Sequence, residues 1–387
     1  MQLPVHAETL PKPMQPSAIV VNGQLRQDLN LAWQAWKARY LREDGAVIVP
    51  EWSTGPGVLY HNVALSEGQS YAMLMAVWAN DAPTFSRVWH WTQAHLQQRK
   101  TDRLLGWLWG PQPAVASGNG LIETDYATDA NEDVAYALIL AATQWKQPAY
   151  LQAAQLLLKD IRQQTLLMVA EKPYLKVGAW GQNQWYVVIN PSYLSPVHYR
   201  AFAQVDSDGA TQWLAAAEAT YPALEGCSRL TPLNLPPDWC GVDYGGKMIP
   251  SFTQPKDSLR FGHDAFRVFW RMRLAATHGD ALAERYLSLQ TALAGFYNQQ
   301  GYLPDGFDEH GKPIRPDWLK EGQSSPWVLA MLLAQSWQGD GPSSENQAKY
   351  QLLRALQQQH KGLWADSDNY YGNSLVWMTL YSLLPKN

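Results

Sequence analysis

Apolar residues recur three and four positions apart through most of the chain, which is the spacing of one face of an α-helix. The segment from Gln24 to Arg42, with the pattern L..DL.LAW.AW..RYL, shows this spacing clearly. The same criterion predicts helices over residues 24–42, 67–80, 85–98, 132–145, 148–165, 209–220, 264–277, 281–299, 325–337, 344–359 and 370–384. The pattern therefore predicts a mainly helical protein.

Strand-like patterns are few. The clearest lies at Tyr174–Ile189 and predicts a β-hairpin that turns near Gly181–Asn183. Because the helices do not alternate with strands, the pattern argues against a βα barrel and against a dinucleotide-binding sheet. We expect one all-α domain over residues 24–387, with long connecting loops, preceded by a proline-rich tail or linker over residues 1–23.

Composition and charge narrow the class of protein. Lys and Arg number 30 and Asp and Glu number 34, so the net charge is −4, and the basic field of a nucleic-acid binder is missing. No apolar run reaches the roughly 18 residues that a membrane span needs. The first residues lack the features of a secretion signal, so either the protein is cytosolic or its export signal is absent from the sequence given. Without a sustained heptad, we expect a monomer.

The two cysteines, Cys227 and Cys240, flank a proline-rich loop. A disulfide in an oxidising compartment and a pair of free thiols are both compatible with this arrangement. The pair therefore does not fix the compartment.

Aromatic usage is unusual, with 19 Trp and 19 Tyr but only 8 Phe. Trp and Tyr combine an apolar face with a polar edge, which suits surfaces that are partly wet. Ordinary packing explains many of these rings individually, but it explains the excess of Trp over Phe less well. The bias suggests a cleft lined with rings, for which sugars are natural ligands because they have apolar C–H faces and hydroxyl rims.

Carboxylates stand at the predicted starts of helices. Glu67 opens an otherwise apolar helix, where desolvation would raise its pKa as a general acid requires. Capping of that helix is the alternative. Asp264 precedes Arg267 by one turn, so it is either a general base held ionised by a cation or half of a surface ion pair.

Asp129 begins another helix, together with Glu132 and Asp133. Three interpretations stay open: a sugar-binding carboxylate, a Mg²⁺ site for a diphosphate, and N-capping by Asp129 with Glu132 as its capping-box partner. The diphosphate site is disfavoured, since the chain shows neither a paired acidic motif nor a basic cluster.

Patterns for other common chemistries are missing from the sequence. The nine His lack metal-ligand spacing, and there is no nucleophile elbow, phosphate-binding loop or dinucleotide-binding motif. We therefore expect neither a metal nor a cofactor. Acids and aromatic residues remain, and they are the usual equipment of glycoside hydrolysis.

Six short segments resemble motifs of glycoside hydrolase family 8, and they occur in family order. They are SEGQSYAM at 66–73, LGWLWG at 105–110, ATDANEDVAYALILAATQW at 127–145, NPSYLSP at 190–196, HDAFR at 263–267 and DNYY at 368–371. The hairpin-like segment before NPSYLSP is similar to that of endoglucanases that accompany bacterial cellulose synthase. The resemblance spans nearly the whole chain.

This resemblance implies an (α/α)6 barrel of six inner and six outer helices with a cleft at one end, acting as an inverting endo-hydrolase of β-1,4-glucan. It makes Glu67 the general acid and Asp264 the general base, and it has Asp129 bind the distorted sugar at the point of cleavage. The residues implied to bind or position substrate are Trp107, Trp109, Tyr193, His263, Arg267 and Tyr371, with Trp109 favoured as a stacking platform. A polymeric substrate implies a periplasmic or secreted protein, with a cellulose synthase complex as a candidate partner.

Three residues depart from the family pattern. Asn131 replaces an Asp, Val134 replaces Ile or Met, and His263 stands where the family usually has Tyr. The presence of Asp264 indicates the branch of cellulases, lichenases and xylanases, although the preferred polysaccharide stays open. The departures leave an alternative, a catalytically weak or inactive glucan-binding protein of a cellulose-synthesis or export system.

Overall fold

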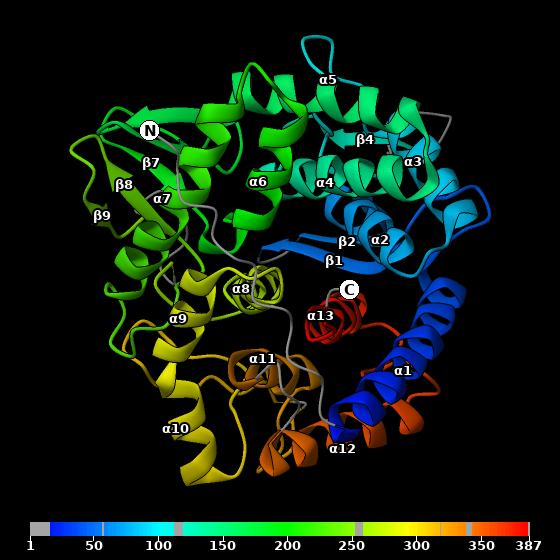
Figure 1. The fold of residues 1–387 in the computed structure, drawn as a ribbon, viewed down its shortest axis with the longest axis vertical. Helices are drawn as coiled ribbons and strands as arrows, with labels where there is room; N and C mark the ends of the chain where they lie inside the picture. Colours follow the sequence, from blue (N-terminus) through cyan, green and yellow to red (C-terminus); the bar gives the residue numbers. More distant parts are fainter. Residues whose placement is uncertain are drawn as a thin grey trace, which may run out of the picture.

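The computed structural model describes residues 16–55, 58–111, 119–251, 258–317, 319–337 and 343–385, and the structural statements below concern these residues. Six helices form a closed inner ring, in which each helix packs against the next and the last packs against the first. They are α2 (Ser66–Trp78), α4 (Thr128–Trp145), α6 (Pro196–Val205), α8 (Arg267–Thr277), α11 (Pro326–Ser336) and α13 (Tyr370–Ser382). Figure 1 shows this ring surrounded by the other helices.

An outer layer of helices covers the ring, one position for each inner helix. The pairs are α1 (Pro16–Tyr40) on α13, α3 (Ala82–His95) on α2, α5 (Pro148–Thr165) on α4, α7 (Ala210–Ser228) on α6, α9 (Ala281–Leu289) on α8 and α12 (Ser344–Gln359) on α11. α10 (Thr291–Gln300) continues the outer layer after α9. The fold is an (α/α)6 barrel, which confirms the predicted fold class.

Apolar character accounts for the inner position of two helices. The inner helices α2 and α11 have the sequences SEGQSYAMLMAVW and PWVLAMLLAQS, and they are apolar on nearly every side. Such helices are stable only where neighbours surround them. The outer helix α12 instead confines its buried residues to one face. Within the described ranges, no helix combines the length and the apolar character that crossing a membrane requires.

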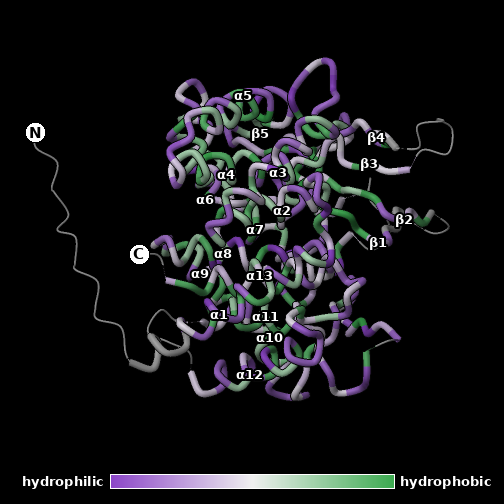
Figure 2. The backbone as a smooth tube through the Cα atoms, turned by 90° about the vertical axis from the view of Figure 1, so that its right-hand side faces the viewer, coloured by the Kyte–Doolittle hydropathy of each residue, from purple (hydrophilic) through white to green (hydrophobic). Residues whose placement is uncertain are grey.

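A small antiparallel sheet positions the start of α2. It contains β1 (Val49–Gly55), β2 (Val58–Leu65), β3 (Leu108–Pro111) and β4 (Asn119–Glu123), in that order. Figure 2 shows these strands on one side of the helical body. β2 leads directly into α2, and the backbone amide of Ser66 donates to the carbonyl oxygen of Trp107 at 3.0 Å. The sheet thereby ties the first residue of α2 to the loop before β3.

The predicted hairpin over Tyr174–Ile189 is wrong. The strands concerned are β5 (Leu166–Val169), β6 (Lys172–Leu175), β7 (Tyr186–Ile189), β8 (Cys240–Asp243) and β9 (Met248–Ile249). β6 pairs with β5, whereas β7 pairs with β8, and β8 with β9. The turn between β5 and β6 uses Ala170 and Glu171, both at positive φ, as a two-residue hairpin requires. Neither residue is typical of such a turn, so the sequence pattern does not reveal it.

Several helix boundaries also differ from the prediction. α1 begins at Pro16 rather than Gln24, while residues 1–15 of the predicted tail lie outside the described residues. The predicted helix over 281–299 is divided at Gln290 into α9 and α10. The inner helix α6 was not predicted, because its 10 residues are too few for a convincing helical period.

A disulfide joins Cys227 and Cys240, which decides between the two alternatives that the sequence left open. The bridge connects the end of α7 to the first residue of β8, and both cysteines are fully buried. It therefore fixes the two ends of the intervening proline-rich loop.

We expect the double variant Cys227→Ser/Cys240→Ser to lose about 2–4 kcal/mol of unfolding free energy, because the unfolded chain regains the freedom that the cross-link removes. Urea unfolding followed by circular dichroism measures this loss. Reduced wild-type protein is the control and should match the variant. Equal stability of the oxidised wild type and the variant would contradict the prediction.

Candidate active site

The predicted site residues lie where the inner helices begin. Glu67 and Asp129 occupy the first turns of α2 and α4. Tyr193 ends a short 3-10 helix, η1 (Pro191–Tyr193), just before α6. Asp264 precedes α8, which begins at Arg267 rather than at Asp264 as predicted. Contacts with Arg267 bring these helix starts together.

Arg267 is the centre of the site, and its side chain is only 2% exposed. Its Nη1 donates to Oε2 of Glu67 at 3.1 Å and to Oδ2 of Asp129 at 2.6 Å. Its Nη2 donates to Oδ1 of Asp264. One guanidinium thus brings together the three carboxylates that the sequence singled out. The interpretation of Asp264 and Arg267 as a surface ion pair is wrong, because Arg267 is buried.

Glu67 lies in a setting that favours its protonated form. Burial, together with the nearby Asp129 and Asp264 carboxylates, raises its pKa to about 8 despite the opposing effect of Arg267. Its Oε1 is buried and has no hydrogen-bond partner among the described residues. The capping interpretation of Glu67 is not supported, since its Oε2 binds Arg267. A carboxyl that stays protonated near neutral pH can act as a general acid.

Asp129 is directed at the site rather than at its own helix. It is 3% exposed and binds Arg267, and the residue before α4, Ala127, makes no side-chain cap. Two residues later, Asn131 accepts from the Leu105 amide at 2.9 Å and donates to the Ala127 carbonyl at 2.9 Å. Asn131 therefore anchors the loop that carries the tryptophans, and it does so with both a donor and an acceptor.

The rest of the acidic cluster points into the barrel. Asp133 forms an ion pair with Arg271 through contacts of 2.8 and 3.1 Å, and His198 lies 3.4 Å from the same carboxylate. Burial lowers the pKa of His198 well below its usual range, so its ring is neutral. Glu132 is fully buried and accepts a long hydrogen bond of 3.5 Å from the Tyr199 hydroxyl. The capping-box role of Glu132 is therefore wrong, and the cluster is not a shared site for Mg²⁺ and diphosphate.

Tyrosines enclose the cation and the segment before Asp264. The guanidinium of Arg267 lies 5.3 Å from the ring centroid of Tyr193. The Tyr371 hydroxyl donates to the carbonyl oxygen of His263 at 2.6 Å. The His263 side chain itself is 53% exposed, and its Nε2 lies 3.8 Å from Oδ2 of the buried Asp305. The His263 ring is thus available to a ligand and lies near a buried carboxylate.

The two tryptophans differ in accessibility. Trp109, the one favoured by the sequence, is 9% exposed, and its ring meets Trp91 edge-on at 5.1 Å. Trp107 is half-buried, and its carbonyl binds the Ser66 amide next to Glu67. Trp107 is therefore the better candidate for a stacking platform.

Comparisons with known proteins identify the family. The sequence profile described as "Glycosyl hydrolases family 8" matches residues 16–310. The chain belongs to glycosyl hydrolase family 8. It is 30% identical over 267 residues to an endoglucanase of Cellulomonas uda, covering 67% of this chain and 69% of that protein. It is 32% identical over 332 residues to a probable endoglucanase of Novacetimonas hansenii, covering 79% and 90%.

Solved structures share the fold. The endo-1,4-D-glucanase of Vibrio fischeri ES114 aligns with a TM-score of 0.72 and 22% identity, over 90% of this chain and 93% of that one. An endo-β-1,4-glucanase from Acetobacter xylinum aligns with a TM-score of 0.69 and 24% identity, over 92% and 98%. At these identities the structures establish the shared fold.

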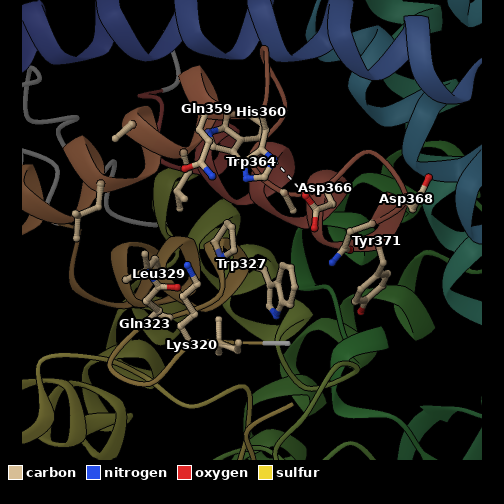
Figure 3. A pocket seen from close by; sticks show the side chains of 18 of the residues that line it. Lys320, Gln323, Trp327, Leu329, Gln359, His360, Trp364, Asp366, Asp368 and Tyr371 are labelled. Atoms are coloured by element: carbon tan, nitrogen blue, oxygen red, sulfur yellow. Dashed lines mark ion pairs between the residues drawn. The ribbon is translucent and has the colours of Figure 1, made fainter. Parts of the chain in front are cut away.

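A cavity of about 1200 Å³ lies at the α13 side of this family 8 site, between α11, α12 and the loop before α13. Figure 3 shows the side chains of Trp327, Trp364 and Tyr371 around it, with the ion pair of His360 and Asp366 on its wall. The rings of Trp327 and Trp364 are buried in its wall, at 4% and 1% exposed, and the three acids bound to Arg267 do not line it. Among the described residues, no three His, Cys, Asp or Glu side chains come together as a metal site.

Tyr71 and Tyr370 belong to the site although the sequence analysis did not single them out. The Tyr71 hydroxyl accepts from Nη1 of Arg267 at 3.4 Å, and its position one helical turn after Glu67 was the available signal. The buried Tyr370 hydroxyl would lie only 3.2 Å from a Cβ at Gly68. Glycine at position 68 therefore lets the tyrosine approach the helix that carries Glu67.

The raised pKa of Glu67 predicts a pH-dependent contribution to stability. Between its ordinary pKa of 4.5 and the folded value of about 8, the folded protein holds a proton that the unfolded chain has released. Glu67 should therefore favour folding most below pH 4.5, and this contribution should be lost as the pH rises to 8. Melting temperatures of the wild type and Glu67→Gln, measured across this range, test it. The melting temperature of the variant should fall less steeply with rising pH than that of the wild type. Parallel curves would contradict the raised pKa of Glu67.

Proposed function

We propose that this protein is an endo-1,4-β-glucanase that hydrolyses cellulose-like chains with inversion. The observation that carries the proposal is the convergence of Glu67, Asp129 and Asp264 on the single guanidinium of Arg267. Relatives that carry the name endoglucanase, each covering most of this chain, support the substrate class. Two carboxyl groups in different environments are the equipment of glycoside hydrolysis.

In this mechanism Glu67 protonates the leaving glycosidic oxygen. Its high pKa keeps the proton available near neutrality, and no described residue forms a hydrogen bond with Oε1. Asp264 is the most exposed of the three carboxylates, with 29% of its side chain accessible, so it can receive a proton from an attacking water. Asp129 is buried beside them and would bind the sugar ring at the cleavage point.

Inversion is the stereochemical outcome that the resemblance to family 8 implies. Inverting enzymes need about 6.5–9.5 Å between the two carboxyl groups, so that a water molecule fits between them and the sugar. Glu67 and Asp264 bind different terminal nitrogens of the guanidinium. Donation from different nitrogens holds these two acids apart, as both inverting and retaining mechanisms require.

The alternative, an inactive glucan-binding protein, rests on His263 and Asn131. Asn131 is occupied with loop and helix backbone groups and makes no contact with the acids, so it weighs little against catalysis. His263 stands where the family usually has Tyr, and both side chains are rings that can form hydrogen bonds, so this exchange also weighs little against catalysis. We therefore favour an enzyme. Association with a cellulose synthase complex and the monomeric state stay predictions.

We place the protein in the periplasm or outside the cell. A glucan polymer is a substrate of those compartments. Disulfides persist where the environment is oxidising, and the Cys227–Cys240 bridge is consistent with such a compartment.

Replacing the acid or the base should abolish most activity. We expect Glu67→Gln and Asp264→Asn each to lose about 10²–10⁴-fold in kcat on a soluble cellulose derivative, the usual contribution of general acid or base catalysis. Release of reducing ends measures this loss, and circular dichroism confirms folding. Asp160→Asn, which changes a buried carboxylate paired with the half-exposed Arg103, is the control and should keep normal rates. Near-normal rates in both site variants would refute the proposal.

Inversion is tested by the anomer of the first product. We expect NMR of freshly cleaved cello-oligosaccharide to show the α-anomer at the new reducing end, because water attacks the face opposite the leaving group. A β-anomer would indicate retention. No new reducing ends with any soluble β-glucan would favour the binding-protein alternative.

A further inference from the structure

The loop that carries Asp264 is held by a second buried carboxylate, Asp238. The Asp238 side chain is 1% exposed. Its Oδ1 accepts from the backbone amides of Gly262 at 3.1 Å and Ala265 at 2.9 Å, which stand on either side of Asp264. Its Oδ2 accepts from Nε of Arg260 at 2.6 Å. Two hydrogen bonds therefore hold the backbone on either side of the proposed base, and the third holds Asp238 to the Arg260 side chain.

Backbone contacts extend this attachment. The amide of Asp238 donates to the Arg260 carbonyl at 2.8 Å, and the amide of Trp239 donates to the Ser258 carbonyl at 2.9 Å. A Cβ at Gly262 would come within 2.8 Å of Oδ2 of Asp238, so only glycine permits this close approach. The two segments lie against each other along their backbones.

The segment with Asp238 is itself anchored from the other side. Cys240, two residues later, forms the disulfide with Cys227 and begins β8, which pairs with β7. Trp239 packs edge-on against Tyr193, with ring centroids 6.2 Å apart. Tyr193 in turn covers the guanidinium of Arg267. A short, cross-linked segment thus contacts both the loop of the base and the ring above the cation.

We propose that Asp238 is a positioning residue for Asp264, acting through the amides of Gly262 and Ala265. The inference rests on the proposed function, because it assigns Asp264 the role of base. Misplacing a reacting group by about 1 Å can cost about 100-fold in rate. Loss of Asp238 should therefore reduce kcat while leaving substrate binding nearly unchanged.

The test is a double-mutant cycle between Asp238 and Asp264. We expect Asp238→Ala to lower kcat about 10- to 100-fold, with KM within about twofold of the wild type, on an aryl cello-oligosaccharide. Asp238→Asn keeps one oxygen for the two amides and should fall between the wild type and Asp238→Ala. If Asp238→Ala fails to fold, Asp238→Asn takes its place in the cycle.

The decisive comparison is Asp264→Asn against Asp238→Ala/Asp264→Asn. If Asp238 acts through the base, removing it after the base has gone should change kcat by no more than about twofold. Asp160→Asn is the matched control, because Asp160 is also buried and binds a backbone amide (2.8 Å) and a guanidinium (3.1 Å), both of Arg103. It should lower stability and leave kcat unchanged.

Two results would overturn the inference: a kcat for Asp238→Ala within twofold of the wild type, or losses that multiply in the double variant. Multiplying losses would indicate a general structural role that is independent of the base. A normal rate for Asp264→Asn alone would instead overturn the proposed function, so the two failures are distinguishable.

Discussion

The candidate site depends on one buried guanidinium shared by three carboxylates. Arg267 could not remain buried and charged without partners, because removing an unpaired ion from water costs several kcal/mol. Its partners outnumber it, however. If Glu67, Asp129 and Asp264 were all ionised, negative charge would exceed positive charge inside the protein. Burial of Glu67, with this excess of nearby carboxylates as a further cause, raises its pKa to about 8. The burial and the nearby negative charge that make ionised Glu67 unfavourable in the folded protein also suit it to act as a general acid.

A second buried ion pair, between Asp133 and Arg271, lies one helical turn deeper in the barrel. Asp129 and Asp133 lie one turn apart on α4, and their partners Arg267 and Arg271 lie one turn apart on α8. Two ion pairs in succession fix the axial position of one inner helix against the other, since a slip would leave buried charges unpaired. The neutral His198 on α6 contacts Asp133 of the second ion pair, so three inner helices meet there. The Asp133–Arg271 pair, one turn further along both helices, therefore helps to set where Asp129 and Arg267 meet.

Segments outside the barrel complete the site. The β1–β4 sheet holds the start of α2, and the disulfide-linked segment before β8 holds the loop of Asp264. Each attachment comes from a different insertion between helices. The barrel thus supplies the helix starts and the cation, while the insertions decide the direction of individual side chains. His263 illustrates this division: it precedes the base in sequence, yet its ring lies 3.8 Å from Asp305 of another loop.

Local sequence determined most of the helices, the inner placement of two of them and the candidate acids. Uninterrupted apolar helices such as α2 and α11 can be stable only inside, and short motifs indicated Glu67, Asp129 and Asp264. Patterns failed where pairing is between distant segments: β7 pairs with β8 rather than β6, the cysteines are bonded, and Trp109 is covered by Trp91. Sequence related Arg267 only to Asp264, three residues away. Its contacts with Asp129 and Glu67 span 138 and 200 residues, and Asp238 reaches Ala265 across 27. Only the closed ring of helices brings such residues together, because no periodicity in the chain encodes contacts between separate helices.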